Sequence, residues 1–221
     1  MARITNRFTN HARKPPAAAG AKRGPDRGMS VRLSSAGGAL AHVASMGMQG
    51  LVLSTAQLHN SWLTAREEWG RDTHQDGAGL RVGDDVDSFA GFAAWVGRLR
   101  RESDPSTVMD PGLVHASYWW IVEDEAYLGA ISLRHTLNDF LLRAGGHIGY
   151  GVRPSARRRG LATWALGAVL PEARALGLER VLVTCDDANV ASARTIESNG
   201  GVLEDVRETE LGLTRRYWID L

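Results

Sequence analysis

One short stretch of the sequence combines residue types that together could bind an anion. Residues 145–166 read GGHIGYGVRPSARRRGLATWAL: a glycine-bearing strand, a proline, three arginines and an apolar helix. Pro154 lacks a backbone donor and therefore ends the strand. The following turn directs successive N–H groups and the positive end of a helix dipole into one concavity, which suits a phosphate or pyrophosphate. Gly160 lets the anion approach the backbone because it carries no Cβ atom.

The strand before this turn indicates what the rest of the ligand is. Gly149 and Gly151 make the strand thin, so an extended chain of amides could lie beside it and pair with it. A ligand with a pyrophosphate at one end and amides at the other is coenzyme A. A nucleotide-binding P-loop is excluded, since it needs a lysine after its second glycine and the last lysine is Lys22. The alternative is that the three arginines form only a solvated surface.

Two blocks of the sequence resemble signatures of the GNAT acyltransferase superfamily. GYGVRPSARRRGLATWAL resembles its acyl-CoA signature, in which a strand ending in V-x-P leads into R-x-x-G-x-A. VTCDDANVASARTIESNGG resembles its second conserved block. The segment SLRHTLNDFLLRAGGHIGYGVRPSARRRGLA and the final RRYWID are similar to a bacterial subgroup of predicted acetyltransferases with largely unassigned substrates. The resemblance covers roughly residues 51–221.

The resemblance implies an acyl-CoA N-acyltransferase fold with acetyl-CoA as co-substrate. It places backbone contacts to pantetheine near Val152, and Asn189 and Ser192 near the coenzyme. The residues that it places around the pyrophosphate are Arg157, Arg158, Arg159, Gly160, Leu161, Ala162 and Thr163. For Asn189 the pattern leaves an alternative, the N-cap of a helix over 190–198. No His/Cys/Asp cluster has metal-ligand spacing, so no metal is expected.

The sequence departs from the family at both catalytic positions. Many members carry a tyrosine seven residues after the asparagine, which protonates the departing thiolate, and here that position is Ile196. Many also carry a glutamate on the glycine-bearing strand as general base, and the matching residue here is His147. Tyr217, on the last predicted strand, could reach the thiolate, but packing in the core is the better interpretation.

The chemistry needs little beyond a base and good positioning. A thioester is already activated, so the enzyme orients an amine, removes its proton and stabilises an oxyanion. A histidine titrates near neutrality, and period-two alternation puts His147 on the strand face of Gly149 and Gly151. We predict His147 as the base, the alternative being a structural histidine. The candidate acceptor-site residues are Arg134, His135 and Asn138, with a polar turn as the alternative.

Hydrophobic periodicity predicts one α/β domain built on a single sheet. Strands are expected at 51–55, 115–124, 126–135, before Pro154, at 180–185, 202–208 and 215–221, and helices at 56–72, 88–102, 160–176 and 190–198. This order predicts a single mixed, mostly antiparallel sheet flanked by helices.

The first fifty residues differ from the rest in composition and charge. They hold eight basic side chains and one acidic side chain, Asp26, a net charge of +7, and are rich in Ala, Gly, Ser and Pro. Such a segment buries too little apolar surface to fold, which predicts a disordered basic tail over 1–48 and the acetyltransferase domain over 49–221. A nucleic-acid-binding arm or a transit peptide is the functional alternative for this tail.

The whole chain has the composition of a cytoplasmic enzyme. It is 43% hydrophobic without a long apolar run, and its single cysteine, Cys185, excludes an internal disulfide. The predicted function is acetyl transfer from acetyl-CoA to a primary amine of a small molecule, peptide or protein. The alternative is a non-catalytic acyl-CoA-binding module. Acetyl-CoA and an amine are the expected partners, a membrane and nucleic acid are not, and a homodimer is compatible with the sequence.

Overall fold

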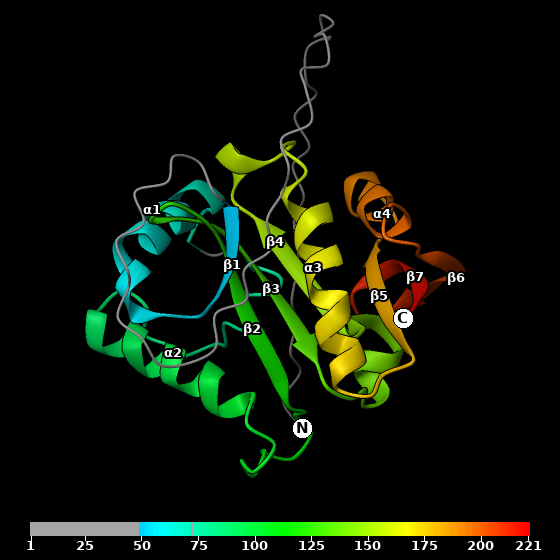
Figure 1. The fold of residues 1–221 in the computed structure, drawn as a ribbon, viewed down its shortest axis with the longest axis horizontal. Helices are drawn as coiled ribbons and strands as arrows, with labels where there is room; N and C mark the ends of the chain where they lie inside the picture. Colours follow the sequence, from blue (N-terminus) through cyan, green and yellow to red (C-terminus); the bar gives the residue numbers. More distant parts are fainter. Residues whose placement is uncertain (1–48, 72) are drawn as a thin grey trace, which may run out of the picture.

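The structure of the protein is a computed structural model that describes residues 49–71 and 73–221 (Figure 1). The predicted basic tail, residues 1–48, lies outside the described residues. The described chain forms a sheet with the strand order β1-β2-β3-β4-β5-β7-β6. The strands are β1 (Gln49–Leu53), β2 (Ala116–Glu123), β3 (Ala126–Arg134), β4 (Ile148–Val152), β5 (Arg180–Asp186), β6 (Val202–Thr209) and β7 (Gly212–Asp220).

One junction of the described sheet is parallel, the one between β4 and β5. All other neighbouring strands pair antiparallel, whereas β4 and β5 are parallel and share the single residue pair Ile148–Val183. After that pair the two strands separate, so the β5-facing edge of β4 has no strand beside it. The prediction of a single mixed, mostly antiparallel sheet is confirmed.

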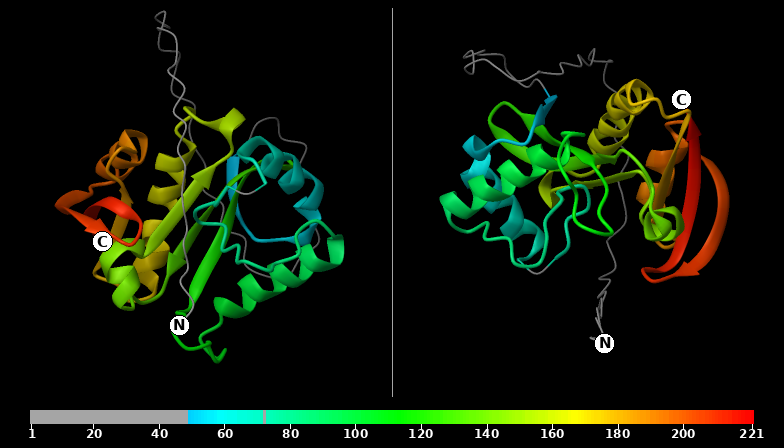
Figure 2. Two further views of the ribbon diagram at one scale, coloured as in Figure 1. Left: turned by 180° about the vertical axis from the view of Figure 1, so that it is seen from behind. Right: turned by 90° about the horizontal axis from the view of Figure 1, so that it is seen from below.

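Helices cover both faces of the sheet (Figures 1 and 2). α1 (His59–Trp69) and α2 (Phe89–Glu102) lie on one face, and α3 (Leu161–Ala175) and α4 (Val190–Glu197) lie on the other. The alternation of β2 shows the two layers, because Trp119 packs in the α3 layer and its neighbour Trp120 in the α1–α2 layer.

Three short helical segments complete the fold. η1 (Ala56–Leu58) and η3 (Pro154–Ala156) are 3-10 turns, and η2 (Leu141–Gly145) is a π-helix within a stretch that the sequence pattern left as a connection. η2 is fixed against β5 and β7, since Thr184 Oγ1 donates to Ala144 O at 2.6 Å and Arg216 Nη2 donates to Leu142 O at 3.0 Å. It therefore covers part of the sheet face that α3 and α4 leave open.

Candidate active site

The predicted phosphate turn lies between the end of β4 and the start of α3. Its backbone is left-handed at Arg158 (φ 62°) and at Gly160 (φ 78°). Glycine adopts this conformation without strain, whereas other residues lose roughly 1–2 kcal/mol there. Left-handed residues within a turn direct neighbouring N–H groups towards a common side, which is how backbone anion sites are built.

The first turn of α3 supplies further donors to the same place. Gly160 is the N-cap residue and offers no side chain, and the first helical bond runs from Trp164 N to Gly160 O at 3.0 Å. The N–H groups of Leu161, Ala162 and Thr163 therefore have no partner within the helix. Together with the helix dipole they form the geometry that a pyrophosphate site needs. Contact with the coenzyme at these residues stays a prediction.

The arginine side chains of the turn are used mainly to hold it in place. Arg157 Nε donates to Val152 O at 3.0 Å, and Arg159 forms an ion pair with Glu123 of β2 at 2.5 Å. The side chain of Arg158 is exposed. The donors that remain for an anion are therefore the backbone N–H groups of the turn and the guanidinium of Arg158.

The unpaired edge of β4 can accept an extended ligand. Arg153 N donates to Leu128 O in β3 at 2.8 Å, so by alternation along the strand the backbone groups of Tyr150 and Val152 point to the β5 side. No strand of the described chain pairs with them there. This edge leads directly to the phosphate turn, and it supports the predicted pantetheine contact near Val152.

The start of α4 lies beside β4. We call the unpaired edge of β4, the phosphate turn and the start of α4 together the opening. Asn189 Oδ1 accepts a hydrogen bond from Ser192 N at 3.1 Å, so the N-cap interpretation of Asn189 is confirmed. The hydroxyl groups of Ser192 and Tyr150 lie 2.8 Å apart and connect α4 with β4. Tyr150 was not among the predicted site residues, although its place between two glycines on a strand was a signal for it.

The residues beneath this opening are buried and have their own partners. Ile196 is completely buried, and Tyr217 is buried with its hydroxyl donating to Glu197 Oε1 at 3.2 Å. Burial raises the pKa of the Cys185 thiol, which keeps it protonated. The core interpretation of Tyr217 is confirmed, and position 196 supplies no proton donor.

The other face of β4 is covered by the chain itself. The loop between α1 and α2 lies on it: a Cβ atom on Gly77 would be 2.5 Å from Gly149 O, and one on Gly151 would be 2.9 Å from Asp76 O. The sequence reasoning took Gly149 and Gly151 as making room for a ligand. The structure corrects this, because on this face the two glycines make room for the α1–α2 loop.

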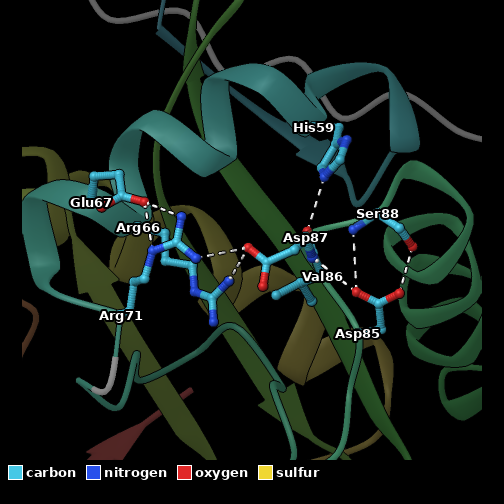
Figure 3. A network of polar contacts seen from close by, with 8 residues as sticks. All are labelled: His59, Arg66, Glu67, Arg71, Asp85, Val86, Asp87 and Ser88. Carbon is cyan, nitrogen blue, oxygen red and sulfur yellow. Dashed lines mark hydrogen bonds and ion pairs between the residues drawn. The ribbon is translucent and has the colours of Figure 1, made fainter.

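A polar network fixes the end of this loop to α1 (Figure 3). Arg66 and Arg71 converge on the carboxylate of Asp87, with Nη1 atoms 2.9 Å and 3.3 Å from Oδ1. His59 Nε2 lies 2.9 Å from Val86 O, in the residue just before Asp87. The loop is thus held at its end by charged contacts and in its middle by close backbone packing on β4.

His147, the predicted base, lies just before β4 and is buried. The ring Nδ1 of His147 accepts a hydrogen bond from Leu182 N at 2.9 Å. The backbone N–H of His147 donates to Leu182 O at 2.7 Å. Burial, and then the nearby charge of Arg134, lowers its pKa to about 4. These contacts join β4 to β5 and favour the structural alternative. The role of His147 as base stays a prediction.

We expect the protein to lose stability between pH 6.5 and pH 4, in part through His147. Its pKa is about 4 in the folded chain against an ordinary 6.5, so the unfolded chain binds the additional proton in this range. One such group contributes at most about 1.4 kcal/mol per pH unit. His147→Asn keeps an acceptor near the place of Nδ1 but cannot titrate, so its urea unfolding free energy should fall less from pH 7 to pH 5. Equal losses in both proteins would contradict the assignment.

The three predicted acceptor-site residues all have partners within the chain. Arg134 is half-buried, donates to Gly145 O at 2.9 Å, and lies near Gly149 of β4. His135 Nε2 lies 2.9 Å from Ser117 Oγ, and burial, followed by the charge of His115, lowers its pKa. Asn138 Oδ1 accepts from the backbone N–H of Leu141, the first residue of η2, at 2.9 Å. The contacts of His135 and Asn138 fit the alternative interpretation, in which these residues belong to a polar turn. Of the three predicted acceptor-site residues, Arg134 is the one that lies next to β4.

Two other features are absent from the part of the chain that the structure describes. There, no group of three or more His, Cys, Asp or Glu side chains is arranged to hold a metal ion. Nor does any helix in residues 49–71 and 73–221 have the length and apolar character needed to cross a membrane.

Comparisons with known proteins identify the family of this chain. Residues 93–202 match the family model of the GNAT acetyltransferase domain. RimJ of Mycobacterium smegmatis, in complex with CoA-disulfide, is 19% identical with a TM-score of 0.60 and covers 79% of this chain and 82% of its own. RimL, a ribosomal L7/L12 alpha-N-protein acetyltransferase in complex with coenzyme A, is 17% identical with a TM-score of 0.57. The match covers 77% of this chain and 93% of the RimL chain.

A third structure, a putative acetyltransferase from Salmonella typhimurium with acetyl-CoA, is 15% identical with a TM-score of 0.51 and covers 78% of this chain and 94% of that one. A comparison with curated protein sequences finds no match. The family match includes β4, the phosphate turn, α3 and the start of α4, which together form the opening described above. The chain therefore belongs to the GNAT superfamily and is an acetyl-CoA-dependent N-acetyltransferase.

Proposed function

We propose that the acceptor is the α-amino group of a peptide or protein, which attacks the thioester of acetyl-CoA directly. The observation that carries this function is the unpaired edge of β4 leading into the phosphate turn. It offers a place for an extended coenzyme with its thioester beside the middle of β4. The names of similar structures support the acceptor, since RimL is an alpha-N-protein acetyltransferase and a Salmonella typhimurium protein modifies the N-terminal serine of a ribosomal protein.

The chemistry of an α-amine suits this site. Its pKa is about 7.7–8.0, so roughly a tenth of it is neutral at pH 7, against about one in a thousand for a lysine amine. The attack needs a base for the proton of the amine and an acid for the departing thiolate. Because Ile196 cannot donate a proton, we assign the acid to the paired hydroxyl groups of Ser192 and Tyr150. The predicted backbone contacts of the turn hold the coenzyme during this step.

A small-molecule amine is the second candidate acceptor. The microcin C7 self-immunity acetyltransferase MccE, in complex with acetyl-CoA and AMP, is 14% identical to this chain with a TM-score of 0.55. The fold of this protein is thus shared by enzymes described with both kinds of ligand.

We expect acetyl-CoA to release free thiol when it is mixed with the protein and a peptide that begins with serine or alanine. The peptide should gain one acetyl group at its N-terminus by mass spectrometry, and a peptide with a blocked N-terminus and no lysine should not react. Release only with small amines would move the acceptor to the second candidate. Binding of acetyl-CoA without release for any amine would support the non-catalytic module instead.

We further propose that the enzyme acts in the cytoplasm and as a homodimer. The single free cysteine leaves no disulfide that would need an oxidising compartment. β6 lies at the edge of the sheet and exposes Val202, Leu203 and Val206, which a second copy could cover.

A further inference from the structure

The α1–α2 loop brings a histidine and an aspartate over the middle of β4. Gln75, Gly77 and Ala78 are buried and fix this part of the loop, and Asp76 O lies close to the Cα of Gly151. His74 precedes Gln75, and Asp76 lies between Gln75 and Gly77. Their side chains are 60% and 73% exposed. The backbone of this loop packs on β4, on the strand face opposite α3 and α4, so the two exposed side chains lie on that side of the sheet.

His74 and Asp76 form a pair in which the ring is held at one nitrogen. His74 Nε2 lies 3.3 Å from Asp76 Oδ1, which leaves Nδ1 available. The hydrogen bond with Asp76 raises the pKa of His74, while burial and the charge of Arg134 act in the opposite direction. Burial is the largest cause of the pKa shifts of Arg134, at the end of β3, and of Tyr150, in β4, and the charge of Asp76 is among the smaller causes of both shifts.

The other histidines of the described chain are committed to structural contacts. His59 bonds to Val86 O, His115 to Glu102 O, His135 to Ser117, and His147 to Leu182 N. Among residues 49–71 and 73–221, His74 is thus the histidine that combines an exposed ring with a carboxylate partner. A carboxylate that orients an imidazole and stabilises its charged form is the arrangement of a general base.

We propose that His74, oriented by Asp76, is the general base of the acetyl transfer. The inference rests on the proposed function. As the amine nitrogen bonds to the thioester carbon, His74 Nδ1 takes the proton that the nitrogen loses, and the imidazolium is stabilised by Asp76. The carbon–sulfur bond then breaks, and the coenzyme leaves as a thiolate that takes up a proton from the paired hydroxyl groups of Ser192 and Tyr150. His74 acts as the catalytic residue and Asp76 as its positioning residue.

The first test is kinetic and uses acetyl-CoA with a serine-initiated peptide that the wild-type protein acetylates. His74→Gln should lower kcat by about 10²–10⁴-fold, the usual range for a lost base, and leave the KM for acetyl-CoA unchanged. It should also remove the acidic limb of the pH–rate profile. His115→Gln, the matched control, should keep that limb. Retention of the limb in His74→Gln, or its loss in His147→Asn alone, would overturn the proposal.

The second test measures the pair without turnover. Asp76 and Arg134 are the charged groups that act on His74, and Asp76 stabilises the protonated ring. Asp76→Asn should therefore lower the pKa of His74, followed by NMR of the imidazole, and move the acidic limb of the pH–rate profile to lower pH by the same amount. An unchanged pKa and profile would overturn the proposal. If the wild-type protein acetylates no amine, the proposed function fails, and this inference fails with it.

Discussion

Replacing Gly160 by valine is expected to weaken the binding of acetyl-CoA by at least about tenfold while the protein stays folded. Gly160 is left-handed (φ 78°) and is the N-cap of α3. A β-branched residue is strained in that conformation by more than roughly 1–2 kcal/mol, so the turn relaxes and its N–H groups lose their common direction. Apart from Gly160 and its two neighbours in the chain, no atom of the described residues lies within 4 Å of the Cβ position, so the added side chain clashes with no other part of the fold.

Two control variants separate the possible causes of that loss. Gly177→Val places the same strain (φ 83°, open surroundings) just after the other end of α3, so it should lower stability similarly and leave the affinity intact. Arg158→Ala removes an exposed charge from the turn and should weaken binding much less than Gly160→Val. Calorimetric titration with acetyl-CoA measures all three. Equal losses in Gly160→Val and Arg158→Ala would contradict a site built from backbone donors.

Gly77→Ala is expected to cause the largest loss of stability among single substitutions in the α1–α2 loop. The added Cβ would lie 2.5 Å from Gly149 O, 2.8 Å from the Cα of Tyr150 and 2.9 Å from Ala130 O, all of them backbone atoms that cannot rotate away. With the strain of a positive φ (79°), the cost is about 2–5 kcal/mol. The loop should lift from β4, and the melting temperature should fall by roughly 10 °C.

Gly83→Ala is the matched control for this prediction. Gly83 lies in the same loop with a similar φ of 93°, but nothing lies within 4 Å of its Cβ position. The difference between the two variants therefore isolates the contact with β4 from the strain of the backbone. Acetyl transfer should be lost in Gly77→Ala and kept in Gly83→Ala, with binding of acetyl-CoA retained in both. Equal melting temperatures would show that the loop does not press on β4 in solution.

The phosphate turn could be predicted from the sequence because its determinants are local. Pro154 ends a strand, Gly160 permits a left-handed residue, and the helix that follows begins without a side-chain cap. Each effect depends on the dihedral angles and hydrogen bonds of a few consecutive residues. For the same reason Asn189 could be recognised as an N-cap.

Only the tertiary structure shows which partners the candidate side chains have. His147 shared a strand pattern with Gly149 and Gly151, but its ring is occupied by Leu182 of β5, a contact between segments far apart in the sequence. Gly149 and Gly151 pack against the α1–α2 loop. That packing brings the loop with His74 and Asp76 to β4. The local sequence pattern determines the backbone conformation and the face of the strand or helix on which a side chain lies. The partner that occupies a face depends on long-range packing, which no short stretch of sequence contains.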